Sequence, residues 1–366
     1  MTHVFHTTST LMQLSFTYFM FGLGVYIVSY GYLTFKIGFK QLIIYGNILF
    51  IVSTILIILT RNIHMLLILR LIQGLGAGSG SVSVATALVR TYYDVSLFKK
   101  IFSYVVAVGM LGSMIAPLFG GYIQHLFTWL GNFTFLLIFA LPLVFITFLF
   151  FPEINNPTRT EGSYFKEFLK NLINKNFITN IIYSILIAAI MSAFTIAMPF
   201  LLQGYFAFTP VGYGWIIFLL ELIISLAAYL NILILKRFTY ESIIPASLFV
   251  STLGVLTLLL ASYFADDSVF SLIIPLAFIL LGITILYLNF VSLAFESDGL
   301  FVVSAASIFG ILQIVGNTVA SSIMAVLSEE SLIPYAWLTV SLFLIMLLLI
   351  FIFHRNYFIF KQRKIN

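Results

Sequence analysis

Two ionisable side chains lie inside long apolar runs of the sequence, and they are the residues best placed for chemistry. At about 1.5 Å of helix per residue, Glu221 stands about 15 Å into one run and Arg70 about 8 Å into another. An ionisable group in hydrocarbon is by default a functional hypothesis. We expect Glu221 to exchange a proton and Arg70 to act as a fixed cation. The structural alternatives are a protonated Glu221 that bridges two helices and an Arg70 that extends outward to water.

Amide and phenol side chains in other apolar runs are candidates to line a substrate cavity. Amides in hydrocarbon need hydrogen-bond partners, which a neighbouring helix usually supplies. Gln313 and Asn317 are four residues apart and therefore share one helix face. A mixed aromatic and amide lining suits amphiphilic organic molecules better than ions or sugars. The predicted cavity residues are Gln13, Gln73, Tyr229, Tyr287, Asn289, Gln313 and Asn317, with Asn47 and Asn231 as further inward candidates.

The residue types that enzymes use are not grouped for catalysis. The chain has no cysteine, which removes thiolate chemistry and cysteine-ligated metals. Its five histidines lie at expected loops or ends, and none pairs with a carboxylate at ligand spacing. We therefore expect no catalytic residue, no metal and no cofactor. A polytopic lipid-modifying enzyme is the alternative from another functional class.

The composition requires a membrane. Hydrophobic residues make up 62% of the chain and charged residues 8%, against about 45–50% and about 25% in soluble domains. The net charge of +5 does not indicate nucleic acid, because 40 Phe and 19 Tyr among so few cations leave no basic face for a phosphate backbone. The lipid bilayer is the expected partner.

The apolar runs predict an all-α membrane protein with about eleven transmembrane helices. A spanning helix needs about 20 mostly apolar residues, and these runs lack the alternation of a barrel strand. The predicted spans are 11–35, 41–60, 65–89, 101–124, 131–151, 177–201, 211–235, 243–263, 269–295, 302–327 and 334–353.

Basic residues predict the orientation. Fifteen of the 17 Lys and Arg fall in loops on one side of these spans, whereas the opposite loops contain only Arg61. The positive-inside rule makes the first side cytoplasmic, together with the C-terminus. The fifteen are Lys36, Lys40, Arg90, Lys99, Lys100, Arg159, Lys166, Lys170, Lys175, Lys236, Arg237, Arg355, Lys361, Arg363 and Lys364.

A polar stretch divides the chain into two predicted helical bundles. Residues 1–151 form an N-terminal bundle of five spans, and residues 152–176 form a cytoplasmic linker that opens with Pro152 and Pro157. Residues 177–366 form a C-terminal bundle of six spans with a basic cytoplasmic tail. This 5+6 pattern is what a 6+6 design would show without its first helix; a genuine eleven-span protein is the competing interpretation.

Glycines and one proline in the spans are predicted packing or gating positions. Gly74 and Gly78 have the four-residue spacing that lets helix backbones touch. In the fourth span, Gly120 and Gly121 follow Pro117, which we expect to kink the helix. Close packing explains such residues in any polytopic protein; a functional role would let smooth helix faces slide.

Three short strings resemble motifs of the major facilitator superfamily. GYLTFKIGFK between the first two spans is similar to its motif A, but Phe35 and Phe39 replace the usual aspartate and arginine, which puts the charge-relay latch in doubt. LRLIQGLGAG resembles motif B through Arg70, Gln73 and Gly74, and APLFGG resembles the end of motif C through Pro117, Gly120 and Gly121. The motif A matches are Gly31, Leu33, Gly38 and Lys40.

Together the motifs resemble the Bcr/CflA group of drug/proton antiporters, over nearly the whole chain. The resemblance implies a two-bundle fold and proton-coupled efflux of small amphiphilic compounds or drugs by alternating access. It also implies a monomer in a bacterial inner membrane. Aligned in this way, residues 11–35 correspond to the family's second helix. A siderophore or metabolite transporter of the same fold, or a truncated remnant that transports nothing, are the alternatives within this class.

Overall fold

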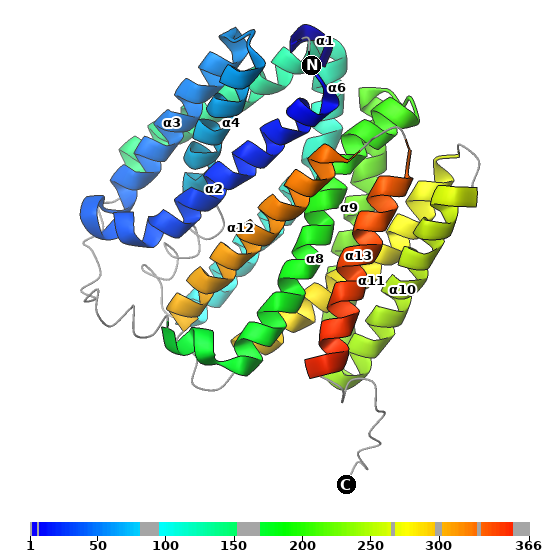
Figure 1. Ribbon diagram of the computed structural model, residues 1–366. Coiled ribbons are helices and arrows are strands. Elements are labelled where there is room, and N and C mark those ends of the chain that lie inside the picture. The colour runs from blue at the N-terminus through cyan, green and yellow to red at the C-terminus, as the bar shows by residue number, and fades with distance from the viewer. Residues whose placement is uncertain are drawn as a thin grey trace. The chain divides into compact units, whose positions relative to one another are not determined.

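The computed structural model is helical through the part of the chain that it describes, residues 2–5, 7–80, 95–151, 169–264, 268–296, 302–327 and 331–353 (Figure 1). Helices satisfy every backbone hydrogen bond within one segment, as hydrocarbon demands. The elements are α1 (Thr2–Phe5), α2 (Ser9–Ile37), α3 (Phe39–Leu59), α4 (Ile63–Ala77), the 3₁₀ turn η1 (Gly78–Gly80), α6 (Val95–Phe150), α8 (Lys175–Phe200), the π-turn η2 (Leu201–Tyr205), α9 (Pro210–Leu235), α10 (Tyr240–Phe264), α11 (Phe270–Phe295), α12 (Val302–Val326) and α13 (Ile333–Phe353).

The predicted all-α membrane architecture is confirmed. Among the described residues, nine helices are long and apolar enough to cross a membrane. Helices α2, α3 and α8 to α13 begin and end within three residues of the predicted bounds. The exception is the predicted span 65–89: α4 ends at Ala77 and a 3₁₀ turn follows, where glycines weaken helical propensity. Residues 81–94 lie outside the described part.

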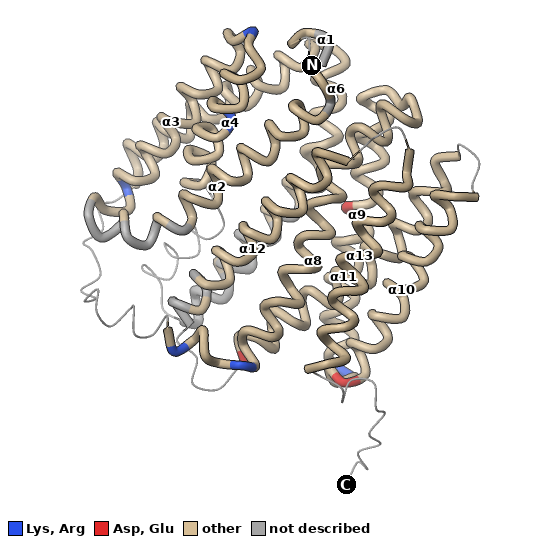
Figure 2. The backbone as a smooth tube through the Cα atoms, in the orientation of Figure 1, with Lys and Arg blue, Asp and Glu red and all other residues tan. Residues whose placement is uncertain are grey.

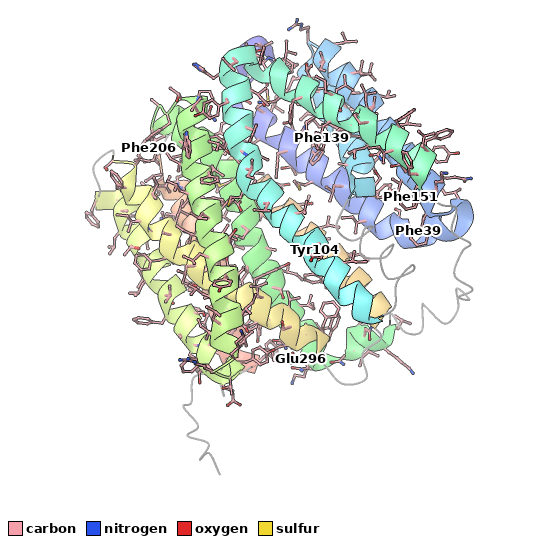
Figure 3. The ribbon with its side chains drawn as sticks, turned by 180° about the vertical axis from the view of Figure 1, so that it is seen from behind. Phe39, Tyr104, Phe139, Phe151, Phe206 and Glu296 are labelled. Carbon is pink, nitrogen blue, oxygen red and sulfur yellow. The ribbon has the colours of Figure 1, made fainter. Side chains whose placement is uncertain are left out.

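Helix α6 contains two of the predicted spans, 101–124 and 131–151. Its apolar stretch Leu111–Phe150 has 40 residues, about twice what one crossing needs. The helical dihedral angles break at Thr128, where φ is 61° and ψ is −169°. Figure 3 shows the two arms on either side of the break, with Tyr104 on one and Phe139 on the other. Pro117 lies inside one of these helical arms, so the kink expected at this proline stays a prediction.

The chain divides into two compact units. Unit 1 comprises Met1–Ser163 and Thr209–Ile217, and unit 2 comprises Tyr164–Phe208 and Phe218–Asn366, so that α9 begins in one and continues in the other. In unit 1, α4 packs on both α2 and α3, and α3 packs on α6. In unit 2, α8 is central and contacts α11, α12 and α13, while α10 packs on α11 and α13. The predicted linker falls mostly on residues 152–168, outside the described part, so the 5+6 domain division stays a prediction.

Glycines bring the backbones of α2 and α4 together in unit 1. A Cβ atom at Gly74 would overlap the carbonyl oxygen of Phe19, and one at Gly22 would overlap that of Leu71. At Gly78 a Cβ atom would lie 2.6 Å from Cβ of Tyr26. These contacts set the two helices at backbone distance and fix which residues of α2 reach the middle of α4.

Candidate functional site

In the described part of the chain, charged residues lie at helix ends with two exceptions. Among the described acidic and basic residues, Arg70 and Glu221 are far from any helix end (Figure 2). Arg70 lies at the centre of α4 in unit 1, and Glu221 lies eleven residues beyond the start of α9, in unit 2. Each is described in the unit to which it belongs.

A chain of hydrogen bonds holds Arg70 and links α4 to α3. The Arg70 guanidinium donates from Nη1 to Oε1 of Gln73 at 2.7 Å. Gln73 is fully buried, and its Nε2 donates to Oγ1 of Thr54 at 2.8 Å. The Thr54 hydroxyl in turn donates to the carbonyl oxygen of Phe50 at 2.6 Å. The amide of Gln73 is therefore fixed in the orientation that presents its oxygen to Arg70.

Aromatic rings cover the Arg70 guanidinium. Its Cζ lies 4.6 Å from the ring centroid of Phe19 on α2 and 5.7 Å from that of Phe133 on α6. The Phe133 and Trp129 rings pack edge to face with their centroids 5.9 Å apart, and the centroids of the Trp129 and Phe5 rings are 5.5 Å apart. Cation–π contacts of this kind stabilise a cation away from water. The residues around the Arg70 guanidinium thus come from four helices of unit 1, α2, α3, α4 and α6.

Gln13, the other predicted cavity residue of unit 1, is not part of this network. Its side chain is 1% exposed, and neither its amide oxygen nor its amide nitrogen has a hydrogen-bond partner among the described residues.

The structure joins the predicted amides and phenols of unit 2 in pairs across helices. Gln313 Nε2 on α12 donates to the hydroxyl oxygen of Tyr287 on α11 at 2.9 Å. Asn289 is fully buried, and its Nδ2 donates to Oδ1 of Asn231 on α9 at 2.8 Å. On α12, Asn317 is linked through its backbone: its carbonyl oxygen accepts a hydrogen bond from Ser192 of α8 at 3.1 Å.

Two predicted residues of unit 2 stay outside these pairs. Glu221 is partly buried and has neither a hydrogen bond nor an ion pair with any described residue. Tyr229 is 59% exposed, and its hydroxyl makes no hydrogen bond within the described part. Glu221 is therefore a carboxyl group in an apolar helix without a described protein partner.

The predicted packing and gating residues have different surroundings. Gly38 adopts φ 80° between α2 and α3, a conformation that favours glycine, while Gly31 lies within α2. Lys40 at the start of α3 has its Nζ 6.0 Å from the ring centroid of Phe148. Figure 3 labels Phe39 and Phe151, which pack together in the hydrophobic cluster beside it.

Residues of the proline-containing motif lie against the start of α9 in unit 1. A Cβ atom at Gly121 would overlap the carbonyl oxygen of Pro210, and one at Gly214 would lie 2.8 Å from that of Pro117. Gly120 is different, because its nearest neighbour would be Oδ1 of Asn132 at 3.7 Å, an ordinary contact.

Sequence reasoning missed the residues that complete these networks. Around Arg70 these are Thr54, Phe19 and Phe133, and beside Asn317 it is Ser192. Hydroxyl and aromatic residues are common in apolar helices, and nothing in the spacing of these four marks them.

The described residues contain no group of three or more His, Cys, Asp or Glu that could hold a metal ion.

Comparison with known proteins gives consistent matches. A family model of the Major Facilitator Superfamily matches residues 1–323. An uncharacterized transporter of Rickettsia bellii is 24% identical over 354 residues, which is 92% of this chain and 86% of the relative. The multidrug resistance protein MdtL of Shewanella oneidensis is 26% identical over 64% of this chain and 59% of its own length. MdtL of Escherichia coli O45:K1 is 24% identical over 56% of this chain and 52% of its own. The chain thus spans less than two thirds of these MdtL relatives.

Proposed function

The chain belongs to the Major Facilitator Superfamily, and on this premise we propose that it exports small amphiphilic compounds in exchange for protons. Membership makes it a multi-pass membrane transporter rather than an enzyme. Our proposal goes beyond family membership in three respects: the direction of transport is export, the coupling ion is a proton, and the substrate is amphiphilic. MdtL relatives named for multidrug resistance, and the resemblance of the motifs to the Bcr/CflA antiporters, favour them.

The observation that carries the proposal is the isolation of Glu221. A carboxyl in hydrocarbon that is held by several hydrogen bonds has a structural role, because its protonation would cost those bonds. Glu221 has none with the described residues. It is therefore able to gain and lose a proton without disrupting the helix packing of unit 2.

The amide and phenol pairs of unit 2 support an organic substrate. Tyr287, Gln313 and the Asn231–Asn289 pair provide donors and acceptors next to apolar and aromatic side chains. Binding sites for drug-sized molecules have this composition, a mainly apolar lining with a few placed polar groups. In the proposed cycle, the two units move relative to one another and expose the substrate residues alternately to either side. Glu221 binds a proton from outside and releases it inside.

We also propose the cellular setting. The transporter acts as a monomer in a bacterial inner membrane, with its C-terminal tail in the cytoplasm. The relatives are bacterial proteins. The basic residues Lys175, Lys236 and Arg237 lie at one end of unit 2, where α8 begins and α9 ends, as the positive-inside rule expects of a cytoplasmic end.

Transport by purified protein in liposomes tests the proposal. Three fluorescent amphiphiles, one cationic, one neutral and one acidic, are offered under an imposed pH gradient. We expect the gradient to drive movement of at least one of them, and a protonophore to abolish it. Movement of none of the three under any gradient would overturn the proposal, and movement of a polar metabolite or siderophore instead would favour the alternative substrates.

A variant pair tests the role of Glu221. Glu221→Gln keeps the size of the side chain and removes its proton exchange, so we expect gradient-driven transport to be lost. Exchange of substrate for substrate without a gradient should persist. Glu241→Gln is the matched control, because Glu241 is exposed near the start of α10. Equal effects of the two substitutions, or full gradient-driven transport by Glu221→Gln, would contradict the assignment.

A further inference from the structure

Arg70 is a partly buried cation, and the described part of unit 1 offers it no carboxylate. Residues 1–163 contain three acidic residues, Asp94, Glu153 and Glu161, and none lies in a predicted span. The described part of unit 1 contains no Asp or Glu. Within those residues the interactions of Arg70 are the hydrogen bond to Gln73 and the contacts with the Phe19 and Phe133 rings.

These neutral groups do not balance the charge. An arginine inside a bilayer is costly and normally pairs with an opposite charge or with backbone carbonyls. Its guanidinium does not release its proton under ordinary conditions, and it has five N–H donors in a planar fork that matches a carboxylate. The Gln73–Thr54 hydrogen bonds hold the head group in place, so the site is organised before a ligand arrives.

We propose that an anionic group of the substrate pairs with Arg70, and that the preferred substrates are therefore acidic amphiphiles. A carboxylate accepts the fork of the guanidinium. The apolar part of the same molecule contacts the aromatic residues that surround Arg70, Phe19 and Phe133. This inference rests on the proposed function and specifies the substrate class of the same transporter.

A pair of probes that differ only in charge tests the proposal. Dansyl-labelled undecanoic acid and its primary amide are titrated against purified protein at neutral pH in an uncharged detergent without anionic lipid, so that the probe is the only amphiphilic anion present. We expect wild type to bind the acid at least about tenfold more tightly than the amide, the size of a charge-assisted hydrogen bond. Equal binding of the two probes would overturn the proposal.

Substitutions test whether Arg70 causes the preference for the acidic probe over its amide. Arg70→Gln should remove the preference for the acid and leave affinity for the amide within about twofold, since only the charged contact is lost. Arg61→Gln is the matched control: it removes a positive charge from an exposed residue before α4 and should keep the preference. Retention of the acid preference in Arg70→Gln would overturn the proposal.

Gln73→Glu tests the same site with Arg70 in place, in case Arg70→Gln does not fold. The Gln73 oxygen already accepts from Arg70 at 2.7 Å, so the substitution places a carboxylate of similar shape at that contact. This internal partner should reduce affinity for the acid about tenfold and spare the amide. Undiminished binding of the acid by Gln73→Glu would overturn the proposal.

The two proposals fail in different ways. If no amphiphile moves under a pH gradient, the proposed function fails. If the cationic or neutral amphiphile moves while the acidic one neither moves nor competes, export stands and the assignment of Arg70 to an anionic substrate is overturned.

Discussion

The two ionisable residues inside the spans are held in opposite ways. Arg70 is fixed by a hydrogen bond to a fully buried glutamine, by two aromatic rings, and by helices α2 and α4 that meet at backbone distance. Glu221 also lies in an apolar helix, but it has no hydrogen bond or ion pair with the described residues. Burial in hydrocarbon therefore does not by itself determine how tightly a charged group is constrained.

The difference matches the chemistry proposed for each residue. A guanidinium that recognises a fixed anionic group benefits from an immobile orientation, because the entropy of ordering it is already lost before the ligand binds. A carboxyl that carries protons must change its protonation state repeatedly, and hydrogen bonds to either state would oppose the change. Substitutions near Arg70 should therefore cost much more stability than substitution of Glu221.

The largest loss is expected where α2 and α4 touch. Gly74→Ala introduces a Cβ atom that overlaps the carbonyl oxygen of Phe19, so the helices must separate at a cost of about 3 kcal/mol. Thermal unfolding in detergent measures it. Gly120→Ala is the control, since its Cβ would meet only Oδ1 of Asn132 at 3.7 Å. Similar melting temperatures for the two variants would contradict a rigid contact around Arg70.

The next effect is expected at Thr54. Thr54→Val keeps the shape of the side chain but leaves the buried Gln73 Nε2 without its acceptor, which costs about 1–2 kcal/mol. Ser53→Ala is the neighbouring control, because within the described residues the Ser53 hydroxyl donates to the Leu49 and Phe50 carbonyls of its own helix. If Ser53→Ala destabilises the protein as much as Thr54→Val, the link from Thr54 to Gln73 does not hold Arg70.

A smaller effect is expected for the amide pair of unit 2. A double-mutant cycle with Asn231→Leu and Asn289→Leu should give a coupling energy of about 1 kcal/mol, typical of hydrogen bonds between helices in membranes. The four proteins of the cycle are compared by unfolding in the same detergent. Additive single effects would show that the two amides do not depend on each other.

The smallest effect is expected at Glu221 itself. Glu221→Gln removes no described hydrogen bond, so its free energy of unfolding should change by less than about 0.5 kcal/mol even though gradient-driven transport is lost. Melting and transport are measured on one preparation. A loss of stability comparable to that of Thr54→Val would mean that Glu221 has a structural partner and would remove the contrast with Arg70.

Much of the fold follows from the order of apolar and polar residues. Runs of about 20 apolar residues must be helical in lipid, which is why α2, α3 and α8 to α13 lie where the runs predict. Prediction was weaker where local backbone geometry decides. The glycine-rich end of α4 adopts a 3₁₀ turn, and the helical dihedral angles of α6 break at Thr128, a position that no proline or glycine marks in the sequence.

The candidate site was predictable only in part. Arg70 and Glu221 are visible in the sequence because charge is rare in apolar runs, and Gln73 is visible for a similar reason. Thr54, Phe19 and Phe133 are not visible, because hydroxyl and aromatic residues occur throughout these helices. Which of them face Arg70 depends on the rotation of each helix about its axis, and a helix that is apolar all round has no pattern that reveals this rotation.

The sequence by itself therefore determined that the chain lies in a lipid bilayer, where its helices run, and which ionisable residues lie inside apolar spans. These follow from the transfer free energy of each residue type, which depends on composition along the chain. Only the tertiary structure decided that Arg70 is held and that Glu221 is not. That distinction depends on which side chains of different helices come within hydrogen-bonding or ring-stacking distance, and packing between helices sets those distances.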